Sequence, residues 1–67
     1  MAVHKVIEVM SESSKSWEDA AQRGVRQASK TVKGIKSVWV KDMSAEVNAK
    51  GAIKMYRVNC KVTFEVK

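Results

Sequence analysis

The chain has 67 residues, with 13 lysines and arginines against 7 aspartates and glutamates, which gives a net charge of +6. A chain of this length forms one domain, residues 1–67, whose small core contributes only marginal stability. Because there is one cysteine, Cys60, and no cluster of cysteines and histidines, neither a disulfide nor a structural zinc can add stability, so we expect self-association.

The basic residues are spread along the whole chain and are not gathered in one segment. Spread charge is typical of a solvated surface, and no recognition motif accompanies it, so we do not expect nucleic-acid binding. The N-terminal residues lack the basic and apolar segments of a signal peptide. No apolar run approaches the roughly 20 residues that span a bilayer. We therefore expect a cytoplasmic protein without membrane contact.

A first strand is predicted over residues 3–10, which are rich in β-branched side chains. Apolar residues occur in both of its registers: Val3, Ile7 and Val9 in one, Val6 and Met10 in the other. A strand that buries one face alone would alternate more cleanly. We therefore expect another subunit to cover part of the second face of this strand.

A helix is predicted to begin after Ser13 or Ser16 and to close at Gly34, a natural residue for the position after a helix. Ser16 with Asp19 three residues later resembles a capping box in which aspartate replaces glutamate. Since Trp17 lies in the apolar stripe of the helix, we expect its ring in the core. The stripe consists of Trp17, Ala21, Val25, Ala28, Val32 and Ile35.

Two further strands complete the chain. Residues 35–47 predict the second strand, with an irregularity near residues 42–45, and a turn follows at residues 48–51. The last strand is the clearest, because apolar and polar residues alternate without a break after residue 55. Cys60 falls in the apolar register, so we interpret it as a small buried hydrophobe and not as a nucleophile.

The predicted order is therefore β-α-β-β, in the α+β class. The two long strands form an antiparallel hairpin. The first strand reaches the second through the helix, which makes it a parallel neighbour or places it at the far edge of the sheet. The helix packs on one face. The other face carries Ser37, Trp39 and Arg57, and it must meet solvent, a ligand or another subunit.

The residue patterns of known enzyme active sites are not found in this sequence. His4 is the single histidine, and no serine or cysteine nucleophile is assigned beside it. The 3 glycines are scattered and form no phosphate-binding loop. We expect a binding or structural protein, not an enzyme.

Trp39 and a pair of carboxylates are the remaining candidates for function. An exposed indole can stack on a planar ligand or anchor a subunit interface, and Arg57 is placed for a cation–π contact with it. Asp42 and Glu46 share a face of a regular strand and can supply part of a Ca²⁺ or Mg²⁺ shell, with water or other subunits providing further oxygens. The alternative is a solubilising pair beside Lys41.

The chain resembles the dodecins over almost all of residues 3–66. "HKVIEV" is similar to their first strand, "SSKSWEDAAQRGVRQASKTV" to their helix and "YRVNCKVTFEV" to their last strand. The resemblance implies a three-stranded antiparallel sheet wrapped around one helix, and trimers assembled into a homododecameric hollow shell. It also implies a non-enzymatic protein that binds or sequesters a small ligand, FMN or riboflavin.

In flavin-binding dodecins, a tryptophan early in the second strand stacks on the flavin, and a glutamine in the last strand bonds its ring. Here Ser37 falls at the stacking position and Arg57 at the glutamine position, while Trp39 lies two residues beyond Ser37. A displacement of about 7 Å along the strand leaves the indole facing the same space between subunits. The resemblance thus implies these three residues as the ligand site.

The chain is also similar to a group of dodecin-like proteins in which flavin is not the evident ligand. Asp42 and Glu46 match acidic positions near the binding site of some dodecins, where a divalent cation takes part. Trp17 after Ser16, together with Arg57, is similar to a branch for which calcium has been considered. The alternative function is therefore a flavin-less shell that holds calcium or magnesium, or a shell that serves assembly alone.

Overall fold

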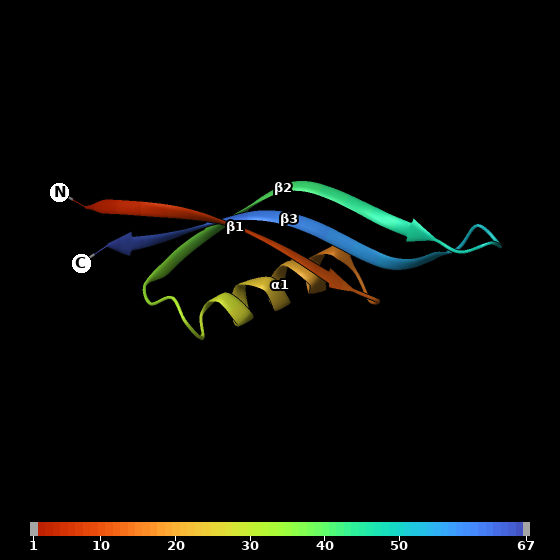
Figure 1. Cartoon of the computed structure of the whole chain (residues 1–67), viewed down its shortest axis with the longest axis horizontal. Coiled ribbons are helices and arrows are strands. Elements are labelled where there is room, and N and C mark those ends of the chain that lie inside the picture. Colours follow the sequence, from red (N-terminus) through yellow and green to blue (C-terminus); the bar gives the residue numbers. More distant parts are fainter. Residues whose placement is uncertain (1, 67) are drawn as a thin grey trace.

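The chain forms three strands and one helix in the predicted order (Figure 1). They are β1 (Val3–Ser13), α1 (Trp17–Ala28), β2 (Ile35–Val47) and β3 (Ile53–Val66). The computed structural model describes residues 2–66, so the two ends of the predicted domain, residues 1 and 67, lie outside it. The predicted β-α-β-β order and α+β class are confirmed.

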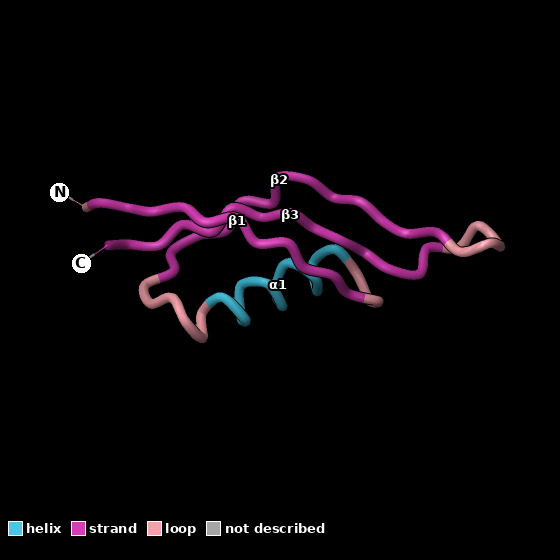
Figure 2. Tube along the Cα trace, viewed as in Figure 1, coloured by secondary structure: helices cyan, strands magenta, loops and turns pink. Residues whose placement is uncertain are grey.

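The last strand is the centre of the sheet. The strand order is β1-β3-β2, and β3 pairs antiparallel with both neighbours. β1 therefore lies at the far edge from β2, which decides between the two placements left open by the sequence. The sheet twists along its length, and α1 covers one face (Figure 2). No helix among residues 2–66 is long and apolar enough to cross a membrane.

β1 is three residues longer than predicted, because its serines bond to the start of α1. The Ser11 hydroxyl donates to the Ala20 carbonyl at 2.5 Å, and the Ser13 hydroxyl donates to the Asp19 carboxylate at 2.5 Å. Serine has little intrinsic preference for strands, so propensity alone ended the predicted strand too early. The tertiary hydrogen bonds extend it to Ser13.

Ser16 is the N-cap of α1, which selects one of the two predicted starts. Its hydroxyl accepts the Asp19 backbone N–H at 2.9 Å, the first half of a capping box. The second half is absent, because the Asp19 side chain bonds to Ser13 and Arg23 instead. The negative charge of Asp19 still lies at the positive end of the helix dipole.

The predicted end of the helix at Gly34 is wrong: α1 ends at Ala28. The Ser29 hydroxyl donates to the Arg26 carbonyl at 2.7 Å, and the backbone N–H groups of residues 30 and 31 make i→i−3 bonds that tighten the last turn. The apolar stripe continues past this point in sequence, but not in the helix. Gly34 instead has a φ of 77° directly before β2, where its carbonyl accepts the Glu65 N–H at 3.0 Å.

β2 has the predicted bounds, but its irregularities differ from the prediction. Its pairing with β3 shifts between Val40 and Asp42, slightly before the predicted place, and shifts again near each end of the strand. The turn after β2 is as predicted. The Asn48 side-chain oxygen accepts the N–H groups of Lys50 and Ala52, and Gly51 supplies a φ of 84°.

The core between α1 and the sheet is small. Ala20 of α1 meets Val58 and Cys60 of β3, and Val62 is buried further along the same strand. Cys60 is 2% exposed, and burial raises the pKa of its thiol, so the prediction of a buried hydrophobe is confirmed. Trp17 packs against this cluster, as its place in the stripe predicted, and is half-buried at the edge of the core.

Gly24 provides a test of the contact between α1 and β1. A Cβ at this buried position would lie 2.7 Å from the Ser11 Oγ. Overpacking of this kind costs about 1–3 kcal/mol, whereas alanine gains roughly 1 kcal/mol over glycine in a helix. We expect Gly24→Ala to lower the melting temperature at fixed protein concentration, measured by circular dichroism. Gln27→Ala, on the exposed side of α1, is the control; a Gly24→Ala variant more stable than wild type, as the helix gain alone would make it, would contradict the close contact.

Asp19 provides a test at low pH. Hydrogen bonds from the Ser13 hydroxyl and from Arg23 hold the pKa of the Asp19 carboxyl below its usual value. A lowered folded-state pKa gives stability that is present above the unfolded-state pKa, near 4, and is lost as the pH falls through the lowered value. We expect Asp19→Asn to be less stable at neutral pH and to lose less further stability below about pH 4. Urea unfolding across this range measures both; a loss parallel to that of wild type would show that Asp19 contributes nothing.

Candidate functional site

The sheet face opposite α1, called here the outer face, has no covering element among residues 2–66 (Figure 1). The strand registers place side chains from all three strands on it. From β1 these are His4, Val6, Glu8, Met10 and Glu12; from β2 they are Ser37, Trp39, Asp42, Ser44 and Glu46; from β3 they are Arg57, Asn59, Lys61, Thr63 and Glu65. All five residues singled out from the sequence, three for a ligand and two for a metal, are in this set.

Trp39 lies in the middle of the outer face. Its side chain is 64% exposed, and its partner across the ladder is Lys61, whose Nζ stands 5.5 Å from the centre of the indole ring. This is a cation–π distance. The cation predicted at this position was Arg57, and that prediction is wrong, because Arg57 lies four residues further along β3 and is engaged elsewhere.

The residues around Trp39 on the outer face have small or apolar side chains. Ser37 shares the outer face with Trp39, as predicted, and lies opposite Thr63. Val6 and Met10 are exposed on the same face of β1. Small polar residues beside an exposed indole leave space next to its ring, and the apolar side chains favour a flat, poorly hydrated ligand or a second protein surface.

Arg57 joins the three strands of the sheet. Its guanidinium donates to the Glu12 carboxylate of β1 at 2.7 Å through Nε and to the Glu46 carboxylate of β2 at 2.8 Å. These bonds, first of all the one with Glu12, raise the pKa of Arg57. Arg57 is half-buried and already neutralises two carboxylates, so its donors are committed within the chain.

Asp42 and Glu46 share the outer face, opposite Asn59 and Met55 of β3. Glu46 is paired with Arg57 and also lies 3.9 Å from Lys54. Within residues 2–66 no group of three or more histidine, cysteine, aspartate or glutamate side chains could hold a metal ion. A cation at this pair would therefore need oxygens from water or from another copy of the chain.

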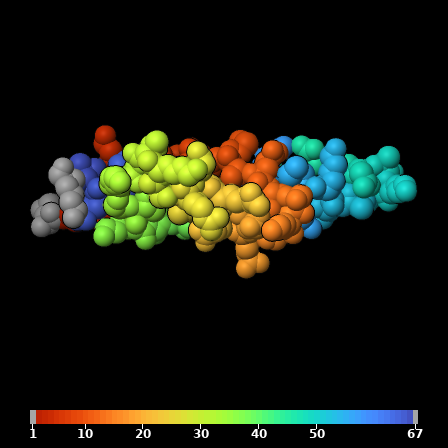
Figure 3. Space-filling view, turned by 90° about the horizontal axis from the view of Figure 1, so that it is seen from below, coloured from red at the N-terminus to blue at the C-terminus, as the bar shows by residue number. Residues whose placement is uncertain are grey.

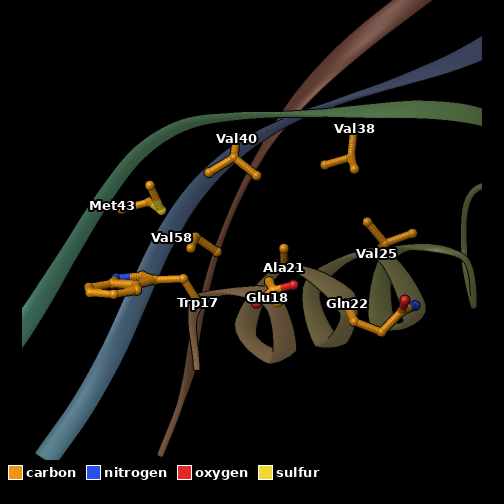
Figure 4. A pocket seen from close by; sticks show the side chains of 9 residues that line it. All are labelled: Trp17, Glu18, Ala21, Gln22, Val25, Val38, Val40, Met43 and Val58. Atoms are coloured by element: carbon orange, nitrogen blue, oxygen red, sulfur yellow. The ribbon is translucent and has the colours of Figure 1, made fainter. Parts of the chain in front are cut away.

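The opposite side of the sheet contains a groove between α1 and β2 (Figure 4). Its volume is about 540 Å³, and it is lined mainly by Trp17, Ala21 and Val25 of α1 and by Val38, Val40 and Met43 of β2. Trp17 closes one end, where its indole N–H donates to the Ser44 carbonyl at 2.9 Å and its ring meets Tyr56 edge-on at 4.8 Å. This α1–β2 groove was not predicted from the sequence.

The fold and these surfaces can be compared with known proteins. The family model for dodecin matches residues 3–67. The chain belongs to the dodecin family. It is 34% identical over 67 residues to the calcium dodecin of Mycobacterium tuberculosis, covering 100% of this chain and 93% of that one. The resemblance drawn from the sequence is thereby confirmed, together with the fold it implied.

Solved dodecin structures have the same architecture. A crystal structure of the Mycobacterium tuberculosis calcium dodecin, described as calcium-chelating with a novel calcium-binding site, has a TM-score of 0.81 and covers 97% of this chain and 91% of its own. A variant of Thermus thermophilus dodecin is 27% identical, with a TM-score of 0.91 over 100% of this chain and 98% of its own. The dodecin of Streptomyces davaonensis, at 23% identity, has a TM-score of 0.91 over 98% of this chain and 96% of its own, and it shows the shared fold. Dodecins are self-assembling proteins that bind small ligands and generally are not enzymes.

Two neighbours of the candidate site residues were not predicted from the sequence. Lys61 and Glu12 lie next to Trp39 and Arg57 through the sheet register alone. The polar register of the last strand contained Lys61, and the serine-rich segment before α1 contained Glu12, but no local pattern indicates which strand pairs with which residue. The pairing partners of β3 decide both contacts.

Proposed function

We propose that this dodecin binds a planar aromatic ligand on its outer face at Trp39, and that the ligand is a flavin, FMN or riboflavin. The role is binding or sequestration without chemical conversion. Ser37 lies beside the ring of the ligand, Trp39 stacks on it, and Arg57 borders the site from the next rows of the sheet. The site is completed by the same face of a second subunit in a homododecamer of trimers.

The observation that carries this proposal is the exposed indole of Trp39 beneath Lys61. A 64% exposed tryptophan leaves much of its apolar surface in water, and stacking with a flat ring removes that surface. The ammonium of Lys61 adds positive charge at the edge of the same place. This arrangement favours a flat ligand that carries negative charge, which describes FMN better than riboflavin.

Assembly is supported by the amount of apolar surface that one copy leaves uncovered. The fully buried core is limited to a few residues around Val58 and Cys60, while valines and methionines on both faces of the sheet are exposed. Burying such surface against further copies contributes the stability that a chain of this size lacks. A ligand held between two outer faces would be stacked on both sides.

A second candidate function is binding of a divalent cation, calcium or magnesium, at Asp42 and Glu46. It is favoured by the 34% identity to a protein named calcium dodecin. Within one chain, the guanidinium of Arg57 already pairs with the carboxylates of Glu46 and Glu12, where a metal cation would bind. A metal would therefore compete with an internal cation, and the outcome depends on further oxygens from neighbouring subunits.

The proposal also covers nucleic-acid binding, which we do not expect, and the location of the protein in the cell. Arg57 and Arg23, and several lysines, are paired with carboxylates, so the excess positive charge is spread and partly neutralised, which argues against nucleic acid as a partner. The unpaired, buried Cys60 suits a reducing compartment, and we place the protein in the cytoplasm.

A flavin titration tests the main proposal. Because the chain has two tryptophans, the fluorescence of the flavin, not of the protein, is the signal of choice. We expect quenching on addition of the assembled protein and a loss of affinity of about 5- to 150-fold in Trp39→Ala, since stacking on an aromatic side chain contributes about 1–3 kcal/mol. Lys61→Gln should weaken FMN more than riboflavin. Lys30→Gln on the helix side is the control, and equal affinity in wild type and Trp39→Ala would refute the site.

Calorimetric titration with CaCl₂ tests the second candidate. Removing the internal cation should free two carboxylates, so we expect Arg57→Gln to bind Ca²⁺ several-fold more tightly than wild type. Glu46→Gln in the same background should reverse the gain, while Glu8→Gln, on the same face but outside the cluster, should not. If Ca²⁺ binds neither wild type nor Arg57→Gln, the cation function is excluded.

A further inference from the structure

The α1–β2 groove exists because α1 does not reach the edge strand. The helix packs over β1 and β3 and touches β2 least. The helix-facing side chains of β2 are therefore uncovered, with Met43 63% exposed and Val38 and Val40 also exposed. Figure 4 shows these side chains pointing toward the helix residues across the groove. The surface is apolar and faces a concave space, so it fits an apolar segment of a protein.

A second uncovered apolar surface lies at the end of the β2–β3 hairpin. Val47 and Ile53 are paired across its last rung and are 57% and 46% exposed. The hairpin tip, defined here as residues 47–53, projects beyond the end of α1 (Figure 3). No element among residues 2–66 covers it.

We propose that the hairpin tip of one copy occupies the α1–β2 groove of the next copy in the assembly. This inference rests on the self-association in the proposed function and names the two surfaces that make it. The tip cannot fill the groove of its own chain. Val40 and Val47 are joined by seven steps of strand, about 23 Å, and pairing with β3 on both sides of the register shift after Val40 keeps that strand extended.

Charge at the two surfaces is complementary. Glu18 lies on the rim of the groove, and Lys50 lies in the turn of the tip. Neither side chain forms an ion pair with another residue of the described range 2–66. The tip carries no acidic residue. When Ile53 and Val47 enter the groove, Lys50 can reach the rim where Glu18 is exposed.

The contact is heterologous, because the groove and the tip are different surfaces of the same chain. Repeated heterologous contacts close into a ring when the rotation between copies allows it. A ring of three is the trimer that the proposed function requires. Each copy in such a ring gives one tip and receives one, so no apolar tip or groove is left uncovered.

Complementation of two variants tests the contact. Met43→Lys spoils the groove and repels Lys50, and Ile53→Glu spoils the tip and repels Glu18. We expect each variant alone to be folded by circular dichroism but to form no trimers by native mass spectrometry, since only the outer-face contact of the proposed function is left to it. A mixture of the two should form larger species than either variant alone, because the first variant keeps an intact tip and the second an intact groove. Lys30→Glu, in the turn that follows α1, should assemble as wild type does.

The other outcomes overturn different statements. A monomeric wild type would refute the self-association of the proposed function. An assembled wild type with an assembled Ile53→Glu variant would overturn the tip as the occupant. Two variants that form no trimers, and whose mixture forms no larger species, would show that the groove meets another groove or another surface.

Disulfide cross-linking tests whether the hairpin tip lies at the groove rim of the next copy, whatever the affinity between copies. In a Cys60→Ser background, Glu18→Cys and Lys50→Cys together should give disulfide-linked trimers under mild oxidation, seen on non-reducing gels. Lys30→Cys with Lys50→Cys is the matched control and should stay unlinked. Linkage of the control pair but not of the rim pair would overturn the proposed seating of the tip.

Discussion

The mismatch in length between the helix and the strands governs this structure. α1 has 12 residues and is about 18 Å long, whereas β3 has 14 residues and extends about 46 Å. One short helix can bury the middle of β3 and part of β1, but it cannot cover β2 or the end of the hairpin. The molecule is consequently elongated, with extents of 52 × 19 × 13 Å, and ten large apolar residues of the described chain remain exposed.

The outer face contains two electrostatic centres of different character. At the first, the ammonium of Lys61 stands over an exposed indole, and its charge has no committed acceptor within hydrogen-bonding distance in the described chain. At the second, the guanidinium of Arg57 is held between two carboxylates and ties β1 to β2 across the central strand. The flat anionic ligand that we propose for the first centre would displace no ion pair of the described chain. A metal ion at the second must displace a cation that is covalently part of the chain. This difference is why we propose a flavin, and calcium only as the second candidate.

The presence of the three strands and the region of the helix start could be predicted because those features are local. The alternation from Tyr56 onward predicts the last strand, though not its central place in the sheet, and Ser16 with Asp19 is one of the two caps that the sequence allows. The helix end was not predictable in the same way, since the apolar periodicity continues to Ile35 while hydrogen bonds of Ser29 and its neighbours end α1 at Ala28. The site depends on register: Trp39 faces Lys61 and not Arg57 because of how β2 pairs with β3. A shift of one residue in that pairing would have changed every partner on the outer face.

The position of the single thiol has a practical consequence. Cys60 lies in the central strand, paired with Val9 on one side and Val40 on the other, and it is sealed by α1. A thiol reagent can reach it only when the helix lifts from the sheet or the sheet opens. The rate of modification therefore reports the frequency of that opening, without any introduced label. Comparing this rate between free and assembled protein would give the local unfolding free energy that neighbouring subunits contribute to each core.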